Sequence, residues 1–122
     1  MQWTQHLADS AFRAGVHRFV LVSSIGAVGN ITTPGNKLDE RTPCNPSGPY
    51  AVSKLQAEQV LVDIARPLNG SYAIIRPPLV HGPGAPGNLA RLAAWVKKGI
   101  PLPFDGLSNQ RSLVHVDNLV QA

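Results

Sequence analysis

The order of helix and strand patterns constrains the fold of this chain most strongly. Residues 2–14 predict a helix, and residues 19–22 form a short apolar run that is typical of a parallel strand covered on both faces. The apolar stripe of the first helix, which is expected to pack, consists of Trp3, Leu7, Ala8, Ala11 and Phe12. A helix at residues 49–65 and a strand at residues 72–76 repeat the order. Because alternating helices and strands favour a parallel sheet, we expect an α/β fold with flanking helices.

The later part of the chain predicts further elements but only a narrow sheet. Pro77 and Pro78 end the second strand, because proline lacks the N–H that a sheet requires. The elements expected beyond them are a loop at residues 79–87, a helix at 88–98, an irregular stretch at 100–109, a short strand at 112–115 and a helix from about Asp117. Two main strands would leave open edges, so we expect the chain to form part of a larger domain.

Composition and charge exclude several classes of protein. With 43% hydrophobic and 15% charged residues among 122, the chain is expected to be globular. Its net charge of +4 comes from basic residues that are spread along the sequence, so we expect no nucleic-acid partner. No apolar run approaches about 20 residues and no signal peptide is visible, so we expect no membrane partner. A single cysteine, Cys44, fits a cytoplasmic protein.

Tyr50 and Lys54 form the pattern with the clearest chemical meaning. They lie four residues apart on the predicted helix, which puts them on one face. Ser47 or Gly48 can cap this helix, and Pro49 suits its first turn. The ammonium of Lys54 and the positive end of the helix dipole both favour a phenolate at Tyr50. Tyr50 is therefore a candidate acid–base group for a sugar hydroxyl or ketone, the alternative being a half-buried tyrosine beside a solvated lysine.

Ser23 and Ser24 directly follow the first strand. In open parallel sheets, ligands bind beyond the carboxyl ends of the strands. We therefore expect Ser24, Tyr50 and Lys54 to meet at that edge of the sheet. Ser24 would then form a hydrogen bond to the reacting oxygen, and Lys54 could contact a ribose. The alternative for the two serines is ordinary turn chemistry.

Together with their surroundings, these residues resemble a known family, the extended short-chain dehydrogenases/reductases, and in particular its NAD-dependent sugar epimerase/dehydratase branch. The segments that carry the resemblance are RFVLVSS at 18–24, PYAVSK at 49–54, IRPPLVHGPG at 75–84 and RSLVHVDN at 111–118. They occur in family order and cover most of the chain. The resemblance implies a Rossmann-type three-layer fold, bound NAD or NADP, and a nucleotide-linked sugar as substrate.

The resemblance also implies roles for individual residues. Ser24, Tyr50 and Lys54 match the catalytic set of the family. The residues implied to bind the cofactor are Ser23, Tyr50, Lys54, Pro77 and Val80. Those implied to bind the substrate are Ser24, Asn88 and Arg111, of which Arg111 suits a diphosphate because its guanidinium is a planar fork. The alternatives are a plain helix cap for Asn88 and a surface salt bridge for Arg111.

Family members begin with a strand and a Gly-rich turn that hold the cofactor, and neither pattern precedes Trp3. We therefore expect residues 1–122 to be the catalytic half of a partial NAD(P)-binding Rossmann-like domain, with the N-terminal cofactor half missing. The substrate-binding part is expected to start at about residue 79. The resemblance further implies a homodimer that forms through the helices at 2–14 and 49–65.

Two other patterns are weaker. Residues 82–87 match G-x-G-x-x-G, and Asp105 follows at a suitable distance for a dinucleotide fingerprint. Pro83 and Pro86 remove N–H groups that a phosphate loop needs, so we expect a loop that borders the sugar-nucleotide site instead. The four histidines and Cys44 show no metal-ligand spacing, and we expect no metal site.

These observations lead to an NAD(P)-dependent epimerase or 4-ketoreductase for a nucleotide-linked sugar, with Tyr50 as the acid–base group. Ile25 and Gly26 stand where dehydratases of the family carry an Asp–Glu pair, which favours epimerase or reductase over dehydratase. Two alternatives stay open: a non-catalytic nucleotide-sugar-binding or assembly module, and a truncated fragment that is inactive on its own. The sequence distinguishes neither the sugar nor NAD from NADP.

Overall fold

The computed structural model describes residues 2–33, 35–84, 88–102 and 110–122. The chain divides into two compact units, Met1–Pro77 and Pro78–Ala122. Each unit contains a pair of parallel strands and flanking helices, which confirms the predicted α/β class.

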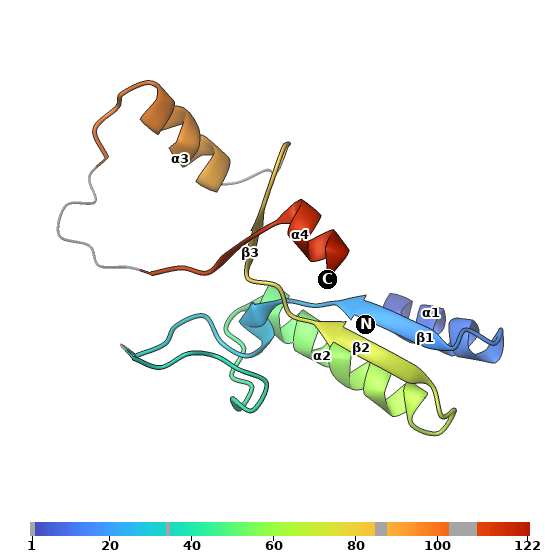
Figure 1. The fold of residues 1–122 in the computed structure, drawn as a ribbon. Coiled ribbons are helices and arrows are strands. Elements are labelled where there is room, and N and C mark those ends of the chain that lie inside the picture. The colour runs from blue at the N-terminus through green and yellow to red at the C-terminus, as the bar shows by residue number, and fades with distance from the viewer. Residues whose placement is uncertain (1, 34, 85–87, 103–109) are drawn as a thin grey trace. The chain divides into compact units, whose positions relative to one another are not determined.

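The first unit combines helices with a pair of parallel strands (Figure 1). Its elements are the helix α1 (Gln2–Arg13), the strand β1 (Arg18–Val22), the 3-10 helix η1 (Ile25–Ala27), the helix α2 (Pro49–Ala65) and the strand β2 (Ser71–Ile75). The predicted bounds of α1, β1, α2 and β2 agree with the structure to within one residue, whereas η1 was not predicted. In the parallel register, Val22 lies opposite Ile75, so the carboxyl ends of the two strands share one edge of the sheet.

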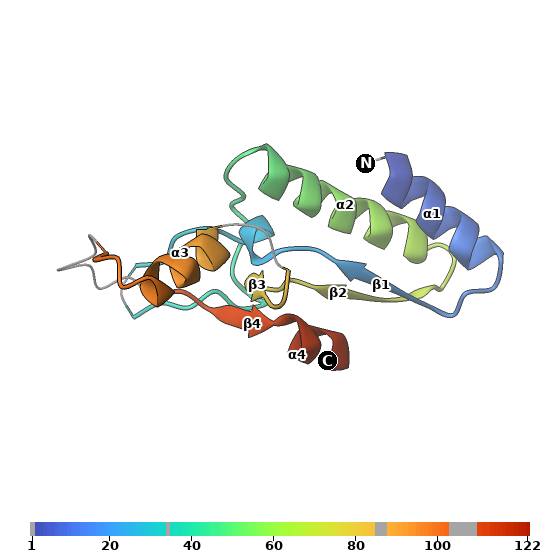
Figure 2. The same cartoon turned by 90° about the horizontal axis from the view of Figure 1, so that it is seen from above.

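Both helices cover the same face of this two-stranded sheet, as the view from above shows (Figure 2). Phe19 and Leu21 of β1 are half-buried, whereas Val20 and Val22 are 51% and 50% exposed. Among the described residues, only one face of β1 is covered, whereas the sequence predicted a strand that is covered on both faces. An apolar run predicts burial but does not specify which element supplies it.

Small residues allow the helices and strands of the first unit to approach closely. The fully or nearly buried apolar side chains of α1 and α2 are Ala8, Ala51, Ala57, Leu61 and Ala65. At Gly70, just before β2, a Cβ atom would lie only 2.6 Å from the ring of Phe12. The same ring packs against Phe19 with 6.0 Å between the centroids. Phe12 thus joins α1 to β1 and to the turn that leads into β2.

The amino-terminal part of α1 differs from the prediction. Phe12 is half-buried, but Trp3 and Leu7 are 89% and 63% exposed. They border an open apolar hollow of ≈ 440 Å³, which Phe19 and Leu21 also line. Helical spacing placed these side chains on one stripe, but the stripe is wider than the surface that the described residues cover.

The second unit contains the strand β3 (Leu79–His81), the helix α3 (Asn88–Lys97), the strand β4 (Leu113–His115) and the helix α4 (Val116–Gln121). β3 and β4 are parallel, and His81 lies opposite His115 with ring centroids 5.1 Å apart. The prediction of a loop at residues 79–87 is wrong for β3, because its partner strand is distant in sequence and the preceding prolines hide the strand pattern. Residues 85–87 and 103–109, which carry parts of the predicted glycine loop and irregular stretch, lie outside the described residues.

Candidate active site

Ser24 is held at the carboxyl end of β1 by backbone geometry. It has extended backbone angles (φ −155°, ψ 146°) and caps η1, where its Oγ accepts a hydrogen bond of 3.2 Å from the Gly26 N–H. The next residue, Ile25, donates its N–H to the carbonyl of Pro77 at 3.0 Å. Since Oγ uses a lone pair for Gly26, its own proton remains available for donation to a ligand.

Tyr50 and Lys54 lie on the first turns of α2, as predicted. Gly48 is the N-cap residue, with a φ of 86° that favours glycine, and Pro49 occupies the first turn. Tyr50 is 64% exposed. The Nζ atom of Lys54 lies 5.8 Å from the centroid of the Tyr50 ring and donates a hydrogen bond of 3.1 Å to the carbonyl of Val22. The cation therefore reaches from the helix to the end of β1.

The Ser24 hydroxyl lies beside the first turn of α2. Gly26 separates them, because a Cβ atom at Gly26 would lie 3.4 Å from the Ser24 Oγ and 3.7 Å from the Cβ of Ala51, the neighbour of Tyr50. The first unit thus brings Ser24, the ammonium of Lys54 and the turn of α2 that carries Tyr50 to one edge of the sheet. A hydroxyl, an accessible phenol and an ammonium at that edge can bind an oxygen of a ligand and exchange a proton with it.

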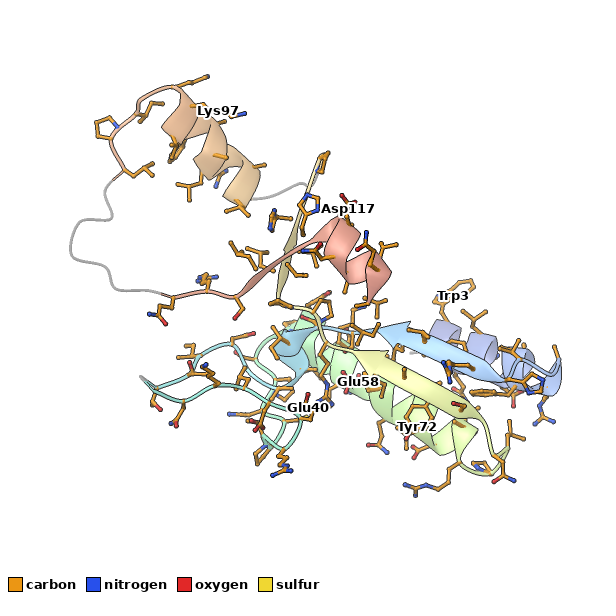
Figure 3. The ribbon with its side chains drawn as sticks, in the orientation of Figure 1. Trp3, Glu40, Glu58, Tyr72, Lys97 and Asp117 are labelled. Carbon is orange, nitrogen blue, oxygen red and sulfur yellow. The ribbon has the colours of Figure 1, made fainter. Side chains whose placement is uncertain are left out.

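A buried ion pair next to this site was not anticipated from the sequence. Glu58 is 3% exposed and lies on the part of α2 that faces the strands (Figure 3). Its carboxylate accepts hydrogen bonds from Arg76 Nη2 at 2.6 Å and Nε at 3.0 Å, and from the hydroxyl of Ser23. The hydrogen bonds and negative charge of Glu58 raise the pKa of Arg76 above its usual range. The sequence signal was a charged residue within the apolar stripe of a helix, between Ala57 and Leu61.

The loop before α2 is tied back to this edge of the sheet. Asn45 donates its N–H to the carbonyl of Val28 at 2.8 Å, and the Asn30 side chain donates to the carbonyl of Ser47 at 3.4 Å. Arg76 Nη2 donates a hydrogen bond of 3.9 Å to the Sγ atom of Cys44, which lies in the same loop. These contacts fix the segment that leads into Pro49 and Tyr50.

The remaining predicted residues differ in their surroundings. Ser23 is buried with its hydroxyl on Glu58, so a cofactor contact from Ser23 would use its backbone carbonyl. Pro77 is buried in the first unit. In the second unit, Val80 is a half-buried residue of β3, Asn88 is the first residue of α3, and Arg111 is exposed just before β4. Their roles stay predictions. The described residues contain no group of three or more metal-ligating side chains and no helix long and apolar enough to cross a membrane.

Comparisons with known proteins give the family of this chain. The model of the NAD dependent epimerase/dehydratase family matches residues 1–122. The UDP-glucose 4-epimerase of Vibrio cholerae is 42% identical over 118 residues, which are 96% of this chain and 36% of that protein. The chain therefore spans about a third of the length of this relative.

Solved structures agree with the sequence comparison. A double mutant of DesIV, the dTDP-glucose 4,6-dehydratase of Streptomyces venezuelae with NAD bound, superimposes with a TM-score of 0.80 at 31% identity, over 98% of this chain and 38% of that one. MoeE5 in complex with UDP-glucose and NAD gives a TM-score of 0.78 at 28% identity, over 99% and 41% of the two chains. The fold is the Rossmann-type fold of these enzymes, and the chain belongs to the NAD dependent epimerase/dehydratase family.

Proposed function

We propose that the full-length protein that contains this chain is an NAD-dependent epimerase or 4-ketoreductase for a nucleotide-linked sugar. The observation that carries this proposal is the grouping of Ser24, Tyr50 and Lys54 at the carboxyl edge of the β1–β2 sheet. The relatives support it, since the Vibrio cholerae protein is a UDP-glucose 4-epimerase and MoeE5 binds UDP-glucose.

Tyr50 is the proposed acid–base group. It takes the proton of the sugar hydroxyl when that carbon is oxidised and returns the proton when the ketone is reduced. Its 64% exposure leaves the phenol accessible to a ligand. Ser24 donates its hydroxyl proton to the same sugar oxygen while its Oγ accepts the Gly26 N–H. Lys54 places a positive charge near the phenol, with its Nζ atom 5.8 Å from the centroid of the Tyr50 ring.

The described residues fit a nicotinamide nucleotide. When bound, NAD supplies the site with a group that accepts and returns a hydride. The ammonium of Lys54 is a cationic donor at the edge of the sheet, where it now bonds the carbonyl of Val22, and it suits the hydroxyls of a ribose. The other proposed cofactor contacts come from Ser23, Pro77 and Val80. The proposed contacts to the substrate diphosphate come from Asn88 and Arg111.

The residues after Ser24 favour epimerisation or reduction over dehydration. Ile25 and Gly26 form the first part of η1, and Gly26 is buried. Neither side chain can donate or accept a proton, so these two positions cannot supply an acid and a base for the elimination of water. Ile25 and Gly26 therefore favour reactions in which Tyr50 transfers the proton.

Replacement of Tyr50 by Phe in the full-length protein tests this function. With UDP-glucose as the probe, we expect conversion to its 4-epimer to fall by about 10²-fold or more, while NAD binding stays close to that of the unmodified protein. Tyr72→Phe is the matched control, because Tyr72 lies on β2 and is 40% exposed. Equal activity of the Tyr50→Phe variant and the control would contradict the proposal. Nucleotide-sugar binding without NAD binding would favour a non-catalytic module.

We further propose that the full-length protein forms a homodimer through α1 and α2. The exposure of Trp3 and Leu7 beside an apolar hollow supports such a contact, since large exposed apolar patches mark interaction sites. Sedimentation velocity tests it: Trp3→Asp should shift the full-length protein toward the monomer. Trp95→Asp on α3 is the control, and a wild-type monomer would exclude the dimer.

A further inference from the structure

We propose that Glu58 is a positioning residue for the reaction. Through Ser23 and Arg76 it fixes the helix that carries Tyr50 and Lys54 against the strand end that carries Ser24. This inference rests on the proposed function, which uses those three residues and assigns no role to Glu58.

The contacts of Glu58 join three elements at one point. Ser23 directly follows β1, Arg76 directly follows β2, and Glu58 lies on α2. One carboxylate oxygen, Oε1, accepts from the Ser23 hydroxyl and from Arg76 Nε at 3.0 Å. The other, Oε2, accepts from Arg76 Nη2 at 2.6 Å and Nε at 3.2 Å. The two-pronged contact with a planar guanidinium fixes the orientation of the carboxylate as well as its place.

These contacts are adjacent to the proposed reactive groups. Glu58 lies one helical turn beyond Lys54 and two turns beyond Tyr50, on the same stripe of α2. Lys54 bonds the carbonyl of Val22, and Glu58 bonds the hydroxyl of the next residue, Ser23. Successive turns of α2 are thus tied to successive residues at the end of β1. The Glu58 contacts remain when Lys54 leaves Val22 for a ligand, and a slide or rotation of α2 would break them and displace Tyr50 relative to Ser24.

A contribution to the stability of the folded protein does not by itself explain the buried Glu58–Arg76 pair. A buried ion pair often contributes no more to stability than well-packed apolar residues of the same size. The side chains are well covered, at 4% exposure for Glu58 and 26% for Arg76, so their charges lose much of their hydration. The pair instead constrains the position and orientation of α2 against the strands, because its hydrogen bonds require specific distances and angles.

The test uses Ser23→Ala in the full-length protein. This change removes the tie between β1 and Glu58 but keeps the Glu58–Arg76 pair. We expect kcat for the nucleotide sugar to fall between about tenfold and about 100-fold, because small misplacements of reacting groups have effects of that size. The KM for the sugar nucleotide and the Kd for NAD should change by less than about twofold. Ser71→Ala, at the exposed start of β2, is the control and should behave as the unmodified protein.

Glu58→Gln is the second variant. It keeps the shape of the side chain and an acceptor for Ser23 but removes the charge that orients Arg76. We expect a folded protein with reduced kcat and nearly unchanged ligand affinity.

Three results would overturn the inference. The first is a lower melting temperature with unchanged kcat of the folded protein, and the second is failure of both variants to fold; each would make the network purely structural. The third is a weaker NAD affinity with unchanged kcat at saturation, which would make Ser23 a cofactor contact. An unmodified protein without turnover would instead refute the proposed function, so the two failures are distinguishable.

Discussion

The two units of this chain differ in how firmly their elements are packed. All of the described residues that are buried belong to the first unit, where α1 and α2 pack on two five-residue strands. In the second unit the strands β3 and β4 have three residues each, and the described residues include no fully buried side chain. The proposed acid–base group therefore stands on the well-packed unit, and the proposed diphosphate contacts Asn88 and Arg111 belong to the thinly packed one. Proton transfer needs rigid support, whereas substrate-binding segments are commonly among the less stable parts of a protein.

The largest expected effect on stability comes from breaking the buried ion pair of the first unit. Glu58→Ala leaves the Arg76 guanidinium without its partner, so the free energy of unfolding of the full-length protein should fall by about 3–5 kcal/mol. Asp9→Ala is the matched control, because it breaks the exposed pair with Arg13, which has an N–O distance of 2.8 Å. The control should leave the midpoint of urea unfolding almost unchanged. Similar midpoints for the two variants would show that the buried Glu58–Arg76 pair contributes no more to stability than the exposed Asp9–Arg13 pair.

Two glycines allow a direct comparison of packing in the two units. A Cβ atom would lie 2.6 Å from the Phe12 ring at Gly70 and 2.6 Å from Val116 Cγ1 at Gly82. Gly70→Ala should destabilise the protein by about 1–3 kcal/mol, because the ring is packed between α1 and β1. Gly82→Ala should have a smaller effect on the unfolding midpoint, since the described residues of the second unit include no fully buried side chain. A larger effect at Gly82 would reverse the comparison.

Hydrogen exchange should separate the units without any mutation. Amides of β1, β2 and α2 are expected to exchange only through large-scale unfolding, because these elements enclose the buried residues. Amides of β3 and β4 should exchange faster through local opening. A nucleotide sugar should slow the second group more than the first if the diphosphate binds there. Equal rates in both groups would contradict the difference in packing.

The smallest effect is expected in the loop before α2. The Thr42 hydroxyl and the Arg41 N–H bond the Asp39 carboxylate and lower its pKa. Because its pKa is lowered by folding, Asp39 stabilises the folded state at pH values above the ordinary pKa of aspartate. This stabilisation is lost as the pH falls through the pKa of the folded state. Thr42→Val should move the pKa of Asp39 back toward about 4, which an NMR titration can measure. An unchanged titration would exclude the Thr42 contact as its main cause.

Local patterns in the sequence predicted most of the first unit. The helix at Pro49–Ala65 combines a glycine cap, a first-turn proline and an apolar stripe with Ala57 and Leu61, so its bounds follow from propensity and spacing. The motif that contains Tyr50 and Lys54 also depends on helical spacing alone. These features could be read directly because each one is decided within a few residues.

The features that the sequence did not reveal depend on distant partners. β3 exists because Leu79–His81 pairs with Leu113–His115, and no local pattern marks that pairing. Glu58 and Arg76 are 18 residues apart, and although Glu58 lies within an apolar stripe, no local pattern identifies Arg76 as its partner. The exposure of Trp3 was also missed, since an apolar stripe does not show how much of it is covered.

A crystal structure of the full-length protein with NAD and UDP-glucose would test the central claim most directly. We expect the hydroxyl oxygens of Tyr50 and Ser24 to lie within about 3.2 Å of the same sugar oxygen, with Lys54 released from the carbonyl of Val22 to contact the ribose. A bound sugar that contacts neither hydroxyl, with Lys54 still on Val22, would contradict the account.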